Sequence, residues 1–245
     1  MARPRHLKNA PIIEAIIDFR VRLPVEFDAE GFSSLREDLS DKYPKIEKGR
    51  VITGSIKIKG DKPIVETTED TGIKGYRFTS RDKKEVAQFR IDGFTFSRLQ
   101  PYTKWESVLD EARRLWELYS LKSSPQVVER ISVQYINRID IPSKSDLEEY
   151  FTASPVLPKK LPQELSQFFT RLVVHEKDLT ASIIQTLVQS PKSEHIGIIL
   201  DINVLKENVK GISEKSIWST MKRMREFKNR LFFALITEKT ARLFE

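Results

Sequence analysis

Two long stretches of this sequence alternate apolar and polar residues, and each one begins half of the chain. In residues 13–23, Ile17 and its alternate neighbours are apolar, while most of the residues between them are charged. Residues 127–141 repeat the arrangement around Val133. Alternation with a period of two indicates a strand that buries one face and leaves the other wet. The sequence therefore predicts a half-buried strand at the start of each half.

The two stretches superimpose at an offset of 116 residues, which matches Ile17 with Val133 and Arg22 with Arg138. Letter matching alone favours an offset of 115, but a slip of one residue turns every side chain to the other face. A bulge in either strand would keep the shorter offset open. We interpret the pattern as a tandem duplication with a period of about 116 residues.

The elements predicted after these strands recur in a similar order. A capping box at Thr103 and Glu106 marks the helix that closes the first half, and Ser213 marks the helix that closes the second. Asp92 and Gly93 lie between two alternating runs, which is a strong hairpin signal. The expected helices cover residues 30–42 and 145–151 besides the two long ones, and the expected further strands cover residues 52–59, around 65, 73–79, 85–91, 94–99, 168–176, 179–188 and 195–204.

This order predicts an α+β fold made of two similar halves, residues 1–124 and 125–245. Each half contains a strand, a helix, several antiparallel strands and a long helix. The two sheets are either separate or joined into one continuous curved sheet.

Composition excludes several classes of protein. The chain has 245 residues, no cysteine and a formal net charge of +7. Disulfides and thiolate chemistry are therefore excluded, and the lack of cysteine favours the cytoplasm. The longest apolar run, Leu231–Ile236, is far shorter than a membrane span. We expect a cytoplasmic protein that does not contact the membrane.

Signatures of catalysis and of cofactor binding are missing from the sequence. His6, His175 and His195 lack the spacing of a metal site, and no glycine-rich phosphate loop or nucleophile elbow occurs. Glu14 and Asp18 share one strand face and could form an acid and base pair, although pairing with neighbouring arginines is the more common use of such residues. We expect no metal and no cofactor, and we favour a binding protein over an enzyme.

Basic residues gather on the polar phase of the predicted strands. Five of them are candidates for binding nucleic acid or another polyanion: Arg20, Arg22, Lys57, Lys59 and Arg138. If these strands share a sheet, its open face is cationic and can follow a phosphate backbone. Ordinary solvated surface charge is the alternative interpretation.

The last helix offers a second surface. Its polar side is predicted to hold Lys222, Arg223, Arg225, Lys228 and Arg230. The first three are candidates for binding a partner protein. The alternative is an amphipathic helix that only covers the sheet of its own half.

Three blocks carry a resemblance that spans the whole chain: NAPIIEAIIDFRV near the start, YINRIDIP after the middle and LFFALITEK near the end. Together they resemble a sporadically distributed family of bacterial proteins to which no function is assigned. The order of elements also resembles the half-unit of the TATA-binding-protein-like fold and of helix-grip proteins, which enclose apolar ligands. These resemblances imply a fold and carry no catalytic residues.

The sequence thus favours a non-enzymatic binding protein with a basic sheet face for nucleic acid or another polyanion. The alternative is a helix-grip module that binds an apolar small ligand between sheet and helix, or an adaptor for a partner protein.

Overall fold

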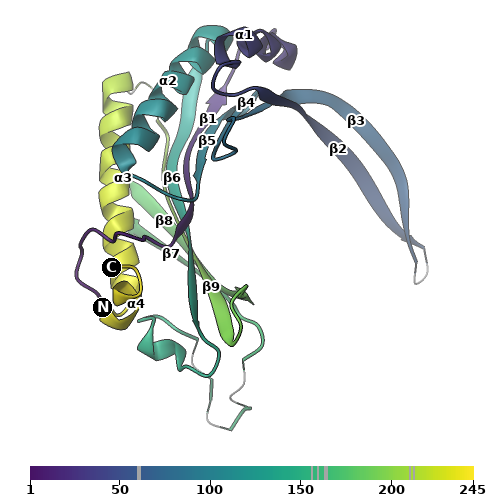
Figure 1. The fold of residues 1–245 in the computed structure, drawn as a ribbon. Coiled ribbons are helices and arrows are strands. Elements are labelled where there is room, and N and C mark those ends of the chain that lie inside the picture. The colour runs from purple at the N-terminus through teal and green to yellow at the C-terminus, as the bar shows by residue number, and fades with distance from the viewer. Residues whose placement is uncertain (60–61, 156, 159, 163–164, 210, 212) are drawn as a thin grey trace.

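The computed structural model describes residues 1–59, 62–155, 157–158, 160–162, 165–209, 211 and 213–245; between residues 50 and 71 the description covers only the backbone. Nine strands of the described chain form one antiparallel sheet in the order β2-β3-β4-β5-β1-β6-β9-β8-β7 (Figure 1). The strands are β1 (Ile12–Arg22), β2 (Lys45–Lys59), β3 (Lys62–Thr79), β4 (Glu85–Arg90), β5 (Gly93–Leu99), β6 (Val127–Pro142), β7 (Phe169–Glu176), β8 (Leu179–Gln189) and β9 (His195–Glu207). The helices are the 3₁₀ turns η1 (Ala29–Ser34) and η2 (Leu147–Glu149) and the α-helices α1 (Leu35–Leu39), α2 (Trp105–Ser123), α3 (Glu214–Leu235) and α4 (Glu238–Arg242).

The strands that begin the two halves pair with each other at the centre of the sheet. β1 and β6 run antiparallel, with Ile17 opposite Val133 and Phe19 opposite Ile131. The sheet therefore continues from one half of the chain into the other. The predicted α+β fold is confirmed, and the continuous sheet is the form it takes.

Helices α2 and α3 cover one face of the sheet and leave the other face open and concave (Figure 1). The apolar phase of each central strand packs under these helices. Phe19 is fully buried there; its ring stacks on Trp116 of α2, with centroids 3.9 Å apart, and meets Trp218 of α3 edge-on at 5.6 Å. Aromatic contacts of this kind add to the burial of apolar area. One core therefore joins the helices of both halves.

The predicted hairpin at Gly93 is present between β4 and β5. Gly93 has a φ of +155°, and a Cβ atom there would lie 2.0 Å from the carbonyl oxygen of Phe19. Only glycine lets β5 approach β1 this closely.

Local elements differ from the prediction in four places. The helix expected over residues 30–42 is η1 followed by the short α1, and Asp28 caps η1 by accepting from the backbone N–H of Glu30 at 3.0 Å. The helix expected over residues 145–151 is the single turn η2. β3 is one long strand where two were expected, because β2 pairs along its whole length. The capping box does not form: Lys104 is the N-cap of α2 and makes no side-chain cap.

No helix in the described part of the chain combines the length and the apolar character that crossing a membrane would require.

A candidate ligand cavity beneath helix α3

The three arginines predicted to bind polyanions lie on the open face of the sheet, but two of them already have partners. Arg20 forms an ion pair with Asp92. The Arg138 guanidinium contacts the Asp140 carboxylate at 3.2 Å and donates to the carbonyl oxygen of Gln189 at 2.7 Å. Each of these pairs reduces the charge that a polyanion would meet.

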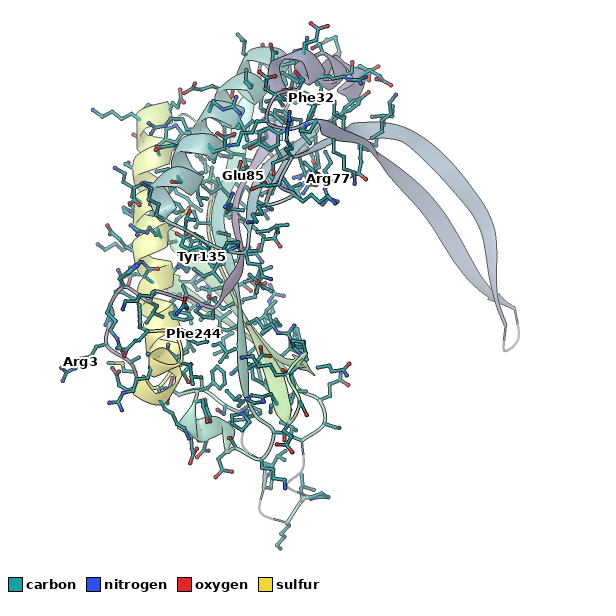
Figure 2. The ribbon with its side chains drawn as sticks, in the orientation of Figure 1. Arg3, Phe32, Arg77, Glu85, Tyr135 and Phe244 are labelled. Atoms are coloured by element: carbon teal, nitrogen blue, oxygen red, sulfur yellow. The ribbon has the colours of Figure 1, made fainter. Side chains whose placement is uncertain are left out.

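The remaining candidates divide into two groups. Arg22 is exposed and forms no ion pair with a described residue. The side chains of Lys57 and Lys59 lie outside the described residues. Arg77 of β3, which was not among the candidates, is also exposed without an ion pair to the described chain, and Figure 2 shows it near the open side of the sheet.

Asp18 lies at the centre of a network on the same face. It accepts a hydrogen bond from the Thr95 hydroxyl at 2.7 Å and forms ion pairs with Arg90 at 3.3 Å and Arg130 at 3.2 Å. These partners come from β5, β4 and β6, so the network ties four strands together across the junction of the halves. The arrangement agrees with the arginine-paired interpretation of Asp18 rather than with an acid and base pair beside Glu14.

The three partner-binding candidates on α3 have separate environments. Lys222 is exposed. Arg223 forms an ion pair with Asp178 in the turn between β7 and β8. Arg225 is half-buried, and its guanidinium lies 5.7 Å from the ring centroid of Trp105. They do not form one free basic surface.

Lys228 was predicted on the polar side of α3, and that prediction is wrong. Its side chain is only 5% exposed. The residue lies one turn after Met224 and one turn before Phe232, so the helical period places it on the stripe that faces the sheet.

A cavity of about 410 Å³ lies beside Lys228, between α3, β6, the N-terminal segment and the loop before α2. We call it the α3 cavity. Its described lining contains cationic, aromatic and amide side chains but neither aspartate nor glutamate: Pro4, Arg5, His6, Leu7, Lys8, Ala10, Pro11, Ile12, Tyr102, Thr103, Tyr135, Asn137, Arg225, Lys228, Asn229, Phe232 and Phe233.

The N-terminal segment forms one wall of the cavity because it is fixed to the end of α3 and to the residues that follow. The backbone N–H of Ala2 donates to the carbonyl oxygens of Phe233 and Ile236 at 3.0 and 2.8 Å. Arg5 forms ion pairs with Glu238 at 2.9 Å and Glu245 at 2.6 Å. The chain ends thus lie side by side, as Figure 1 shows.

Lys228 has no compensating charge. Its amine nitrogen lies 3.5 Å from the ring centroid of Tyr135 and makes no hydrogen bond or ion pair with a described residue. Burial, and then the nearby Arg225 cation, hold the pKa of Lys228 well below its usual range. The ring attracts an ammonium by up to about 2 kcal/mol, which is less than the several kcal/mol that an unpaired buried ion costs. Burial therefore favours the neutral amine more at this position than at an exposed lysine.

A pair of tyrosines completes the inner wall. The Tyr102 and Tyr135 hydroxyls are 2.9 Å apart, and Figure 2 shows Tyr135 in the layer between α3 and the sheet. Burial raises the pKa of both hydroxyls, so they stay protonated and can donate hydrogen bonds.

The cavity can hold a ligand that has an apolar body and a polar or anionic group. Apolar and aromatic walls with a few polar groups are typical of small-molecule sites. No continuous stretch of the sequence indicates this site, because its walls come from four distant segments. The one signal that could have found it is the helical spacing of Lys228 with Met224 and Phe232.

A scan against models of known protein families and a search of curated proteins found no match to this chain.

Proposed function

We propose that this protein is a non-enzymatic binding protein that holds a small organic ligand in the α3 cavity. The observation that carries the proposal is a buried, unpaired lysine beside a cavity of about 410 Å³ between helix and sheet. Leaving a polar group buried without a partner lowers stability. Such strained or uncompensated groups cluster at functional sites.

The lining indicates the class of ligand. Lys8 and Lys228 bring basic groups without an ion pair to a described residue, and Arg225 pairs with Glu106 only at 3.9 Å, in a cavity whose described lining has no carboxylate. Phe232 and Phe233 supply apolar surface beside them. The ligand that fits is a small organic anion with an apolar body. This makes the helix-grip alternative from the sequence more specific, because it adds an anionic group to the apolar ligand.

The test uses 1-anilinonaphthalene-8-sulfonate, a fluorescent probe with an aromatic body and one sulfonate. We expect one probe to bind per folded chain. Thr103→Trp places a large ring at the mouth of the cavity and should weaken binding at least tenfold. Lys104→Trp is the matched control, because Lys104 is also exposed but does not line the cavity. Equal affinity in the two variants would refute the proposal.

A second candidate is the polyanion-binding face expected from the sequence. Its support is the exposure of Arg22 and Arg77 on the open side, together with a net charge of +7. The double variant Arg22→Ala and Arg77→Ala should lower the affinity for duplex DNA and reduce the slope of log affinity against log salt by about 0.9 per lost phosphate contact. Lys222→Ala, on the helix side, is the control. Binding that does not change with salt would exclude this candidate.

The fold supports a further part of the proposal, a duplicated arrangement like that of TATA-binding proteins. Opposite residues of β1 and β6, such as Ile17 and Val133, lie on the same face. A local twofold axis through this pair relates the strands by an offset of 116 residues, whereas an odd offset requires a bulge. Membership of the bacterial family suggested by the three sequence blocks stays a proposal of the same kind.

A further inference from the structure

We propose that the ε-amine of Lys228 forms an imine with a small carbonyl compound that also carries an anionic group. The proposal rests on the proposed function of the α3 cavity as a ligand site. It adds a covalent step and assigns that step to one atom.

The environment of the Lys228 amine favours nucleophilic attack. The charged and titratable groups that line the cavity are Arg225 on the same helix, Tyr135 on β6, Tyr102 in the loop before α2, and Arg5, His6 and Lys8 in the N-terminal segment. The nearby carboxylate of Glu106 pairs with Arg225 at 3.9 Å, and no described carboxylate forms an ion pair with Lys228. A lysine that is desolvated beside another cation is the kind of amine that attacks carbonyl groups.

The other residues of the cavity can hold a carbonyl compound that carries an anionic group. The guanidinium of Arg225 can bind the anionic group of the ligand, because its ion pair with Glu106 is long, at 3.9 Å. The Tyr102 hydroxyl can donate a proton or a hydrogen bond to the carbonyl oxygen. The aromatic rings of Phe232 and Phe233 line the cavity and can contact the apolar body of the ligand.

The step balances without an oxidant or a reductant. The lone pair on Nζ adds to the carbonyl carbon, and one N–H proton passes to the oxygen, which gives a neutral carbinolamine. The nitrogen lone pair then expels the hydroxyl group, which takes up a proton and leaves as water, and the resulting iminium releases the last N–H proton. The product is an imine between Lys228 and the former carbonyl carbon.

The experiment uses glyoxylate, an aldehyde that carries a carboxylate, with sodium cyanoborohydride at pH 7 to reduce any imine to a stable amine. Peptide mapping by mass spectrometry then locates the label. We expect Lys228 to react at least about tenfold faster than the exposed lysines, because an ordinary lysine with a pKa near 10.4 is almost fully protonated at this pH. Acetaldehyde, which lacks the carboxylate, should label Lys228 more slowly than glyoxylate does.

Two variants provide controls. Lys228→Met should lose the fast label, and Lys222→Met, on the exposed side of the same helix, should keep it. If the label were spread over exposed lysines and Lys228 were unmodified, the proposed imine at Lys228 would be wrong. If the sulfonate probe still bound in that case, only the covalent step would fall. If Thr103→Trp and Lys104→Trp bound the probe equally well, the proposed function would fall, whatever the labelling pattern.

Discussion

Replacement of Lys228 by methionine is expected to stabilise the protein at pH 7 by about 1–3 kcal/mol, the range found for buried polar groups without partners. The structure supplies the reason: the side chain is 5% exposed and has no ion pair with a described residue. Methionine has a similar shape, fills irregular spaces and needs no hydrogen bond.

The effect should depend on pH with a definite sign. The pKa of Lys228 is depressed in the folded state and ordinary in the unfolded state. At any pH between the folded and the unfolded pKa of Lys228, the unfolded chain binds more protons than the folded chain. The free energy of unfolding of the wild type therefore rises with pH in this range. The advantage of Lys228→Met should therefore be larger at pH 7 than at pH 10, as the pH approaches the unfolded pKa of about 10.4.

Urea denaturation followed by tryptophan fluorescence measures the gain in stability and its dependence on pH, since Trp116 and Trp218 lie in the core. Each kcal/mol should also shift Tm by about 2–4 °C in a chain of this size. The matched control is Lys222→Met, an exposed change expected to stay within about 0.5 kcal/mol. A variant of Lys228 that is less stable at both pH values, or equally improved at both, would refute the reasoning.

Three further changes test the fold. Gly93→Ala should destabilise the folded protein by about 2–4 kcal/mol in urea titrations, because the new Cβ would lie 2.0 Å from the Phe19 carbonyl oxygen. Gly72→Ala is the control: no atom lies within 4 Å of its new Cβ, so it should cost only about 1 kcal/mol. Burial opposes ionisation of Glu111, but hydrogen bonds from its neighbours lower its pKa to about 2. The stabilisation it contributes is present above about pH 4.5 and is lost as the pH falls toward the folded pKa, so Glu111→Gln should flatten the loss of stability between pH 5 and 3, and an unchanged slope would contradict this. Asp18→Asn should lower Tm and cost about 1–3 kcal/mol, because Arg130 loses its counter-charge and Arg90 keeps only Asp92; an unaltered Tm would show that the network does not stabilise the sheet.

How far the sequence predicted the site is clearest on α3. The apolar stripe of the helix is readable from the sequence, but the charge of Lys228 favours the polar side while its helical position favours the buried side. The spacing from Met224 to Phe232 already placed Lys228 on the buried side. On the open sheet face, Arg20 and Arg138 were assigned to the correct face, but their ion-pair partners could not be predicted.

The sequence by itself determined what depends on near neighbours in the chain. Alternation around Ile17 and Val133 predicted which side chains share a face, because the pleat of a strand is set by adjacent residues. The turn at Gly93 and the long helix begun by Ser213 were likewise readable from a few residues.

Only the tertiary structure decided which segments meet. The α3 cavity combines residues 4–12, 102–103, 135–137 and 225–233, which are brought together by the pairing of β1 with β6 and by the hydrogen bonds of the N-terminal segment. No local pattern encodes such contacts, because they depend on how whole elements pack. The lowered pKa of Lys228 follows from that packing, since burial without a carboxylate disfavours the ammonium form.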